Sequence, residues 1–280
     1  MRIGLSTPVV VQQPGISSPW EATAGRPELV RVARAADQLG FDHLTCSEHT
    51  AVPAAAAADG RGTTYWHPLA TLSYLAAHTS RIRLATSVVV LGLHHPLELA
   101  KSYGTLDRLS GGRLVLGVGV GSLREEFELL GASFDDRGAR ADEVLAALRT
   151  AWGRREVDGF VVEPHATRTE PVLWVGGRTA RSLRRAVALG TGWVPFGLRP
   201  EELRAMLAGA ERPDDFEVVL SPGRPLDPEG DPDGVRRRLM VMVNAGATIV
   251  TCAVRAESVG HHCDQLAALR GLAHEIGPAY

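Results

Sequence analysis

Eight short apolar segments alternate with longer amphipathic patterns along the whole chain, and this alternation constrains the fold more than any other feature. The segments are rich in β-branched residues, as strands are, and they lie at 2–7, 41–47, 82–91, 113–119, 171–177, 192–197, 216–221 and 247–254. Strands that alternate with helices form a parallel sheet. Eight such units favour an α/β fold with one domain over 1–280, a (β/α)8 or TIM barrel, because doubly wound sheets more often have about five to seven strands.

The helical patterns carry start and stop signals. In the helix expected over 27–40, Pro27 suits the first turn, Leu29 and Val32 share one face, and Gly40 suits the carboxyl-terminal cap. Further helices are expected at 67–78, 96–109, 137–153, 179–189, 200–208, 233–244 and 258–275. We also expect a loop over 51–64 and a hairpin over 157–164.

Composition removes several classes of function. The net charge is -2 and charged residues make up 22% of the chain, so nucleic-acid binding has no electrostatic support. No uncharged apolar run has the length of a membrane span, and the start, MRIGLSTPVV, lacks the features of a signal peptide. The cysteines Cys46, Cys252 and Cys263 do not have the spacing of a zinc site or a disulfide framework. We therefore expect a cytoplasmic protein that binds neither membranes nor metal.

One glycine-rich stretch, LVLGVGVGSLREEF from Leu114 to Phe127, runs from an expected strand into a charged helix. Glycines here let another group approach the backbone closely. The dinucleotide fingerprint G-x-G-x-x-G is not met, because Ser122 stands where its last glycine is required. Two interpretations stay open: the glycines only permit tight packing, or a planar ligand lies against them in the carboxyl-terminal mouth of the barrel. We favour the second.

The segment from Arg83 to Gly131, RLATSVVVLGLHHPLELAKSYGTLDRLSGGRLVLGVGVGSLREEFELLG, resembles the luciferase-like monooxygenase superfamily. The likeness is to its branch that uses coenzyme F420, a deazaflavin. It continues through FDDRGARADEVLAALRTAW (134–152) and PVLWVGGRTARSLRRAVALGTGWVPFG (171–197). The resemblance implies a (β/α)8 barrel, a cofactor in its carboxyl-terminal mouth and a homodimer.

The resemblance also implies a catalytic pair and a contact with the cofactor ring. Glu48 and His49, in the motif SEH, would approach the ring and the substrate. His49 would move a proton, since histidines titrate near neutral pH, and Glu48 would position the ring or His49. Thr86, Ser87 and Val88 would press on the ring through a cis peptide bond between Ser87 and Val88.

Two further groups would bind the polar tail of the cofactor. The backbone beneath that tail would be Gly119, Val120 and Gly121. The phosphate would be held at a helix start by Gly176, Gly177, Arg178 and Thr179.

The substrate is less constrained. Trp66 either walls the substrate pocket or packs against the loop that precedes it. Sugar-phosphate dehydrogenases of this superfamily carry a catalytic glutamate where this chain has Ser122, which argues against glucose-6-phosphate oxidation and leaves Ser122 as a substrate contact. His94 and His95 would point to opposite sides of a strand, so that one reaches the pocket and the other packs. The other polar residues have structural interpretations: a helix start for Glu125 and Glu126, a mutual contact for Arg137 and Glu143, and solvation for His261 and His262.

Other functions stay as alternatives. A Schiff-base aldolase needs a lysine at a strand end, and Lys101 lies inside an expected helix. A metal-dependent hydrolase needs histidines that the first strand lacks. A monooxygenase of the same superfamily would use FMN, with a partner reductase supplying the reduced cofactor. A non-redox binding protein or lyase is the last alternative.

We expect a small-molecule substrate and a homodimer. The helices after the second and third strands carry small and apolar residues that would face either the barrel or a second subunit: Ala70, Leu72, Ala76, Leu97, Ala100 and Leu106.

Overall fold

Eight parallel strands close into a barrel in the computed structural model, which describes residues 1–58 and 62–277. They are β1 (Arg2–Leu5), β3 (His43–Cys46), β5 (Arg83–Thr86), β7 (Leu114–Gly119), β10 (Leu173–Gly176), β11 (Gly192–Val194), β12 (Glu217–Leu220) and β13 (Ile249–Cys252). Each strand pairs with the next, and β13 pairs with β1 from Arg2↔Ile249 to Leu5↔Cys252, so the ring is closed. The expected (β/α)8 barrel is confirmed.

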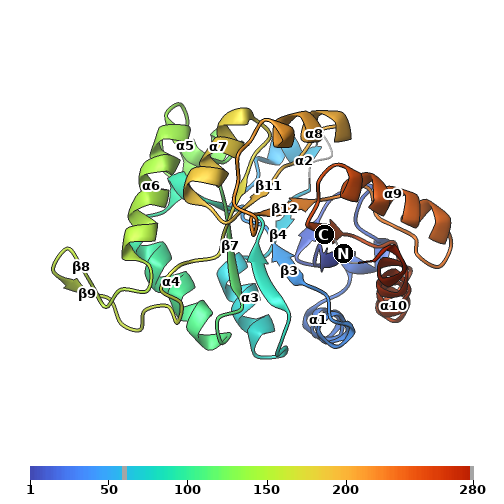
Figure 1. Ribbon diagram of the computed structural model, residues 1–280. Coiled ribbons are helices and arrows are strands. Elements are labelled where there is room, and N and C mark those ends of the chain that lie inside the picture. Colours follow the sequence, from blue (N-terminus) through green and yellow to red (C-terminus); the bar gives the residue numbers. More distant parts are fainter. Residues whose placement is uncertain (59–61, 278–280) are drawn as a thin grey trace.

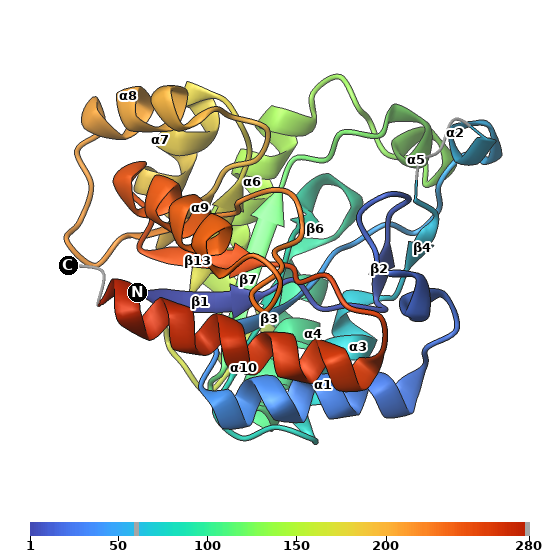
Figure 2. The ribbon, with the colours of Figure 1, turned by 90° about the vertical axis from the view of Figure 1, so that its right-hand side faces the viewer.

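Helices follow the strands and lie outside the barrel (Figure 1). They are α1 (Arg26–Leu39), α3 (Pro68–Ala76), α4 (Pro96–Leu109), α6 (Arg137–Ala151), α7 (Ala180–Leu189), α8 (Pro200–Ala208), α9 (Pro232–Asn244) and α10 (Val259–Ile276). The first and last of these, α1 and α10, lie side by side (Figure 2). The ranges of α4 and α8 agree with the sequence analysis.

Local signals explain where the helices begin and end. In α1, the Glu28 carboxylate accepts a hydrogen bond from the Gly25 N–H at 2.9 Å and so caps the first turn. Gly40 ends the helix in the left-handed region with φ of 74°. Leu29 and Val32 are fully buried, which confirms the expected inward face.

The strand expected over 82–91 is split. After β5 the chain continues through a cis peptide bond between Ser87 and Val88, as the resemblance implied, into β6 (Val89–Val90) and a 3₁₀ turn, η2 (Leu91–Leu93). The short strand β6 pairs with β7. His94 and His95 therefore follow a turn, and the expectation that they lie on opposite faces of a strand is wrong.

The loop expected over 51–64 contains structure. It holds a short helix, α2 (Ala54–Ala58), and β4 (Thr64–Tyr65), while residues 59–61 lie outside the described part of the chain. Strand β4 pairs antiparallel with β2 (Val11–Gln12). Two-residue strands this far apart in sequence leave no periodic pattern to detect. The expected hairpin near 157–164 is confirmed as β8 (Glu156–Val157) and β9 (Phe160–Val161).

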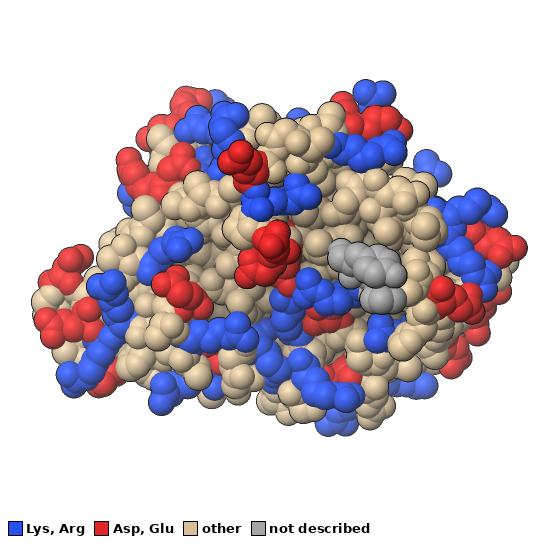
Figure 3. Space-filling model, in the orientation of Figure 1, with Lys and Arg blue, Asp and Glu red and all other residues tan. Residues whose placement is uncertain are grey.

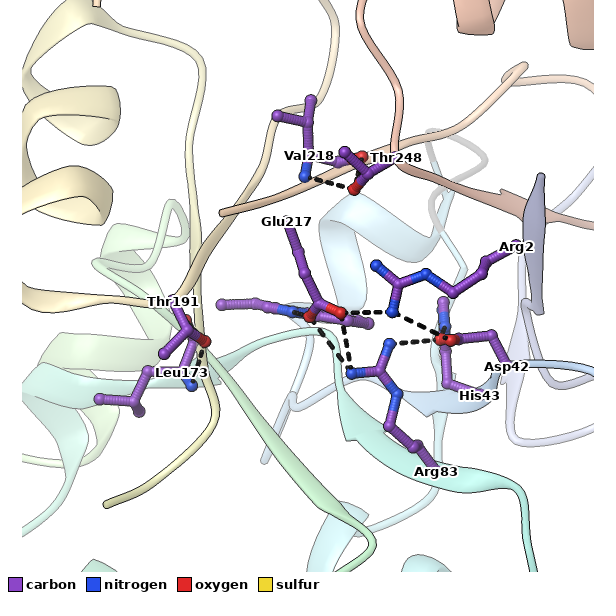
Figure 4. Close-up of polar contacts among 10 residues, drawn as sticks. Arg2, Asp42, His43, Arg83, Leu173, Thr191, Glu217, Val218 and Thr248 are labelled. Carbon is purple, nitrogen blue, oxygen red and sulfur yellow. Dashed lines mark hydrogen bonds and ion pairs between the residues drawn. The ribbon is translucent and has the colours of Figure 1, made fainter. Parts of the chain in front are cut away.

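A polar cluster fills the amino-terminal end of the barrel (Figure 4). Arg2 and Arg83 both contact the Glu217 carboxylate, at 2.6 and 3.1 Å. Arg83 also pairs with Asp42 at 2.5 Å, and the indole N–H of Trp174 donates to Glu217 at 2.6 Å. The cluster joins the starts of β1, β5 and β12 to β10 and to the residue before β3.

His43 extends this cluster into the barrel. Its ring is fully buried and contacts Asp42 at 2.8 Å and the Thr251 hydroxyl at 3.0 Å. Burial raises the pKa of Asp42, but the hydrogen bond and charge of His43 and the charge of Arg83 outweigh it, and the net pKa falls to about 2. Burial lowers the pKa of His43.

On the surface, acidic and basic side chains are interspersed over the face shown in Figure 3. Among the described residues, no helix has the length and apolar character needed to cross a membrane.

Candidate functional site

A cavity of about 220 Å³ lies at the carboxyl-terminal mouth of the barrel. This is the end at which barrel enzymes place their active sites. Strand ends contribute hydroxyl side chains to its wall: Ser6 and Thr7 after β1, Ser47 after β3, Ser87 after β5 and Ser221 after β12. The sequence analysis had singled out only Ser87 among these, because isolated serines and threonines at strand ends form no motif.

The wall at β3 and β5 is held by short polar contacts. The Ser47 hydroxyl donates to the Ser87 carbonyl at 2.8 Å, next to the cis peptide bond. The buried Thr86 hydroxyl donates to the Gly117 carbonyl at 2.7 Å on the neighbouring strand. These bonds fix the end of β5 against both of its neighbours in the barrel.

Glu48 is bound to the segment after β5. Its buried carboxylate accepts hydrogen bonds from the Val90 N–H at 2.7 Å and from His94 Nε2 at 2.9 Å. His94 also lies 3.6 Å from Glu98. Burial lowers the pKa of His94, but the hydrogen bond and charge of Glu48 outweigh it, so the net pKa is raised. Glu48 thus positions His94 rather than His49, and its contact with the cofactor ring stays a prediction.

His49 has a different carboxylate partner. Its Nδ1 lies 2.8 Å from the Glu126 carboxylate, which is almost fully buried on α5 (Arg124–Leu129) and also accepts the Thr50 N–H at 2.5 Å. The ring packs edge-on against Tyr65, with centroids 4.5 Å apart. A carboxylate on Nδ1 leaves Nε2 of a neutral imidazole as the acceptor. The sequence motifs assigned Glu126 only a helix-dipole role, because its partner His49 lies 77 residues away and a single sequence carries no signal for such a pairing.

Ser47 lines the cavity, but the next two residues, Glu48 and His49, are not among its described lining residues. Those two side chains therefore lie beside the cavity, toward β6 and α5.

Protein atoms occupy the space beside the glycines of the β7 stretch. A Cβ built on Gly117 would lie 2.0 Å from the Thr86 carbonyl oxygen, and one on Gly119 would lie 2.6 Å from Val88 Cγ2. At Gly121, with φ of +78°, it would lie 2.6 Å from the Phe127 ring. The packing interpretation therefore explains why these positions are glycine. Contacts of Gly119, Val120 and Gly121 with a cofactor stay a prediction.

The expected phosphate site lies one strand further along. Gly176 ends β10, and its hypothetical Cβ would lie 3.0 Å from Val88 Cγ1, so this strand end adjoins the cis peptide. Thr179 caps α7: its hydroxyl accepts the Ser182 N–H at 3.2 Å, and its own N–H donates to the Ser182 hydroxyl at 3.1 Å. Arg178 is exposed at this helix start.

Gly177 has φ of +142°, and a Cβ there would lie 2.5 Å from Ser182 Cβ. A side chain at this position would disturb the start of α7 whether or not a phosphate binds there.

Two other expected residues lie apart from the cavity lining. Trp66 packs against the core between β4 and α3, and its backbone N–H donates to the Val10 carbonyl at 2.9 Å. Ser122 is exposed between β7 and α5. Their roles toward a substrate stay predictions.

Two further expectations are wrong. Arg137 stacks on Phe134, 3.8 Å from the ring centroid, and donates to the Phe134 carbonyl, whereas Glu143 pairs with Arg140. Phe134 lies three residues before Arg137, and Arg140 lies three residues before Glu143, so the short separation in sequence could have indicated both contacts. His262 is 2% exposed and lines the cavity, although solvation was expected, because α10 turns its first-turn ring inward.

The neighbouring His261 was expected to be solvated, and its side chain is partly exposed. His261 is half-buried and lies 3.2 Å from the Glu229 carboxylate.

Across residues 1–58 and 62–277, no three His, Cys, Asp or Glu side chains gather in a way that could hold a metal ion.

Comparison with known proteins supports the same family as the sequence motifs. The family model for luciferase-like monooxygenases matches residues 1–223. An uncharacterized protein of Mycobacterium tuberculosis is 31% identical over 203 residues, covering 65% of this chain and 70% of that protein. The 4-hydroxyprotoasukamycin monooxygenase of Streptomyces nodosus subsp. asukaensis is 35% identical over 198 residues, covering 68% of this chain and 47% of that protein.

Solved structures share the fold. Monooxygenase RslO1 from Streptomyces bottropensis has a TM-score of 0.78 at 24% identity, covering 98% of this chain and all of that one (100%). The coenzyme F420-dependent tetrahydromethanopterin reductase from Methanopyrus kandleri scores 0.65 at 14%, with coverages of 88% and 94%. The oxygenating constituent of 3,6-diketocamphane monooxygenase from Pseudomonas putida, in complex with FMN, scores 0.58 at 20%, with coverages of 79% and 66%. The chain belongs to the luciferase-like monooxygenase family.

Proposed function

We propose that this protein is an F420-dependent oxidoreductase that transfers a hydride to or from a small organic substrate in the mouth of the barrel. The observation that carries the proposal is the polar cavity beside Ser87 and Val88, in a chain that matches the family over residues 1–223. The motifs TSV at Thr86–Val88 and GGRT at Gly176–Thr179 resemble the deazaflavin branch. When bound, a deazaflavin would supply the hydride-transfer chemistry.

The residues at the mouth fit such a group at the start of α7, and they leave polar atoms for a substrate elsewhere in the cavity. The Thr7 hydroxyl and the ring nitrogens of His262 are buried beside the cavity, with no hydrogen-bond partner among the described residues. Buried polar atoms normally have partners, so these atoms suit a polar ligand. At the adjoining strand end, the N–H groups at the start of α7 and the guanidinium of Arg178 suit a phosphate.

His49 is the proton carrier in this proposal. Glu126 holds Nδ1 at 2.8 Å and fixes the ring, so Nε2 is the atom that takes or gives a proton. His94, held by Glu48, lies at the next strand end and keeps that end attached to α4.

An FMN-dependent monooxygenase, served by a partner reductase, is the second candidate. The observation in its favour is that the asukamycin relative and two of the similar structures are named monooxygenases, one of them in complex with FMN.

Titration of the purified protein with F420 and with FMN, followed by fluorescence, tests both candidates. We expect saturable binding of F420, with FMN bound more weakly. Tighter binding of FMN would favour the monooxygenase, and binding of neither would refute the proposal.

The phosphate site is tested by Arg178→Ala. Removing one charged hydrogen bond should weaken the binding of either cofactor by about tenfold. Arg184→Ala, on the exposed face of the same helix, is the matched control and should leave the affinity unchanged. Equal affinities for both variants would place the phosphate elsewhere.

A further inference from the structure

One side of the mouth cavity carries polar groups that no part of the proposed mechanism uses. Thr7 follows β1, and His262 lies in the first turn of α10, so two elements from opposite ends of the sequence meet at this wall. His262 is 2% exposed and Thr7 is 5% exposed. The Trp20 ring packs edge-on against His262 with centroids 5.5 Å apart, which limits the orientation of the imidazole.

These side chains lack internal partners. Neither ring nitrogen of His262 nor the Thr7 hydroxyl has a hydrogen-bond partner among the described residues, although all three atoms are buried. Leaving buried donors and acceptors unpaired destabilises a fold, and such atoms are therefore rare unless they serve a ligand or an ordered water. A polar wall of this kind is suited to the recognition of a bound molecule.

The charge of the wall restricts what it can recognise. Burial lowers the pKa of His262 to about 4, so the imidazole is neutral at pH 7 and offers one donor and one acceptor. Among the described lining residues, Glu21 carries the formal charge, and its carboxylate already accepts the Val9 and Ser18 N–H groups at 2.9 and 2.7 Å. Burial raises the pKa of Glu21, so its charge is not the main determinant. No Lys or Arg is among the described lining residues to pair with an anionic substrate, and an unpaired charge is costly to bury.

We propose that His262 and Thr7 form a substrate subsite that selects a neutral molecule bearing a hydroxyl or carbonyl group, and rejects carboxylates. This inference rests on the proposed function, because it names the substrate class of the same cavity. The imidazole and the hydroxyl can each donate to a carbonyl oxygen or accept from a hydroxyl. Ser47 and Ser87, which also line the cavity after β3 and β5, lie on the side assigned to the cofactor.

The test compares three probes of similar size: cyclohexanone, cyclohexanol and cyclohexanecarboxylate. Each is titrated calorimetrically at pH 7 into the protein, both free and saturated with whichever of F420 and FMN it binds. We expect the ketone and the alcohol to bind at least about tenfold more tightly than the carboxylate. His262→Phe and Thr7→Val should each weaken the ketone about three- to tenfold and leave the cofactor affinity within about twofold.

A second readout separates recognition from a structural role. Since Phe removes the unpaired nitrogens and its larger ring adjoins the cavity, His262→Phe should raise the melting temperature, whereas a structural histidine would lower it on replacement. His261→Asn is the matched control, because His261 pairs with Glu229 rather than lining the cavity, and it should change none of the probe affinities.

The subsite is refuted if the carboxylate binds as tightly as the ketone, or if both variants keep the wild-type affinity for the ketone. It is also refuted if His262→Phe loses the cofactor instead. Failure of the proposed function is seen separately, as the absence of F420 and FMN binding to the wild-type protein. If His262→Phe does not fold, Thr7→Val alone tests the subsite, because valine keeps the shape of the threonine side chain.

Discussion

At the scale of single residues, the pairing of His49 with Glu126 bears most directly on chemistry. A general acid–base group contributes about 10²–10⁴-fold to a rate. His49→Ala should lower turnover by that range and leave cofactor affinity within about threefold, because the ring does not line the mouth cavity. Steady-state kinetics with a confirmed substrate and a cofactor titration measure the two effects.

Glu126 provides the accompanying test. Glu126→Gln should lower turnover less than His49→Ala, since the amide oxygen can still accept the Nδ1–H bond, while the amide NH2 then faces the Thr50 N–H that the carboxylate had accepted. Glu125→Gln, on the exposed side of the same helix, should have no effect. If His49→Ala kept the wild-type turnover, His49 would not transfer the proton. If His49→Ala lost cofactor binding, His49 would belong to the cofactor-binding site.

Gly119 and Val88 test the packing explanation of the glycine run. Gly119→Ala places a Cβ 2.6 Å from Val88 Cγ2 and should destabilise the protein by about 1–3 kcal/mol in urea unfolding. Adding Val88→Ala makes room and should restore part of that loss. Gly271→Ala, in α10 with nothing within 4 Å, should be neutral or stabilising by up to about 1 kcal/mol. Full additivity of Gly119→Ala and Val88→Ala would contradict the contact.

The sequence motifs identified Glu48 and His49 as site residues, but they did not identify the side chains that bind them. The SEH motif placed Glu48 and His49 after β3, where the structure has them. Their partners His94 and Glu126 lie 46 and 77 residues away, and a single sequence carries no signal for a pairing over that distance. His262 was misjudged for the same reason, since its burial depends on Trp20 and the β1 loop packing over α10.

At the scale of elements, local signals predicted the helices well and the strands in outline. Proline near the first turn and glycine at the cap define α1, and the ranges of α4 and α8 agree with expectation. The strand over 82–91 was predicted as one element because most of its residues are apolar. The turn at Ser87 and Val88 depends on the backbone, and composition does not reveal it.

The cluster at the amino-terminal ends of the strands makes stability depend on acid. The pKa of Asp42 is lowered from 3.8 to about 2 in the folded state, so its contribution is fully present above pH 4 and is lost as the pH falls toward 2. The contribution is about 2 kcal/mol. The difference in unfolding free energy between wild type and Asp42→Asn should therefore shrink over that interval, as measured by urea unfolding at a series of pH values.

Asp214→Asn, at an exposed loop position, serves as the control and should track the wild type at every pH. A constant difference between wild type and Asp42→Asn from pH 5 to pH 2 would show that Asp42 has an ordinary pKa.

At the scale of the whole molecule, the sequence predicted one closed barrel, and the ring from β1 to β13 confirms it. Alternation of strand and helix sufficed because few folds accommodate eight such units. Of the residues named for a subunit interface, Leu72, Ala76, Ala100 and Leu106 are buried in the core of the single chain. Packing within the same chain therefore explains why these four residues are apolar, and no second subunit is needed to explain them.

We still expect a homodimer through α3 and α4, with the exposed Ala70, the half-buried Leu97, and Leu109, which is 70% exposed at the end of α4, near the interface. Light scattering should give twice the 29.9 kDa of one chain. Leu109→Arg should shift the mass toward that of the monomer, and Met240→Arg, a similar change on α9, should not. A monomer mass for the wild type at micromolar concentration would contradict the expectation.

The pairing of β13 with β1 has a consequence for biosynthesis. Residue 2 lies opposite residue 249, so the ring cannot close until nearly the whole chain has left the ribosome. During translation, β1 and each newest strand expose unpaired backbone groups, which other nascent chains can pair with. We therefore expect a chain released before β13 to aggregate or to require a chaperone, even though most of the mouth cavity is already encoded within it.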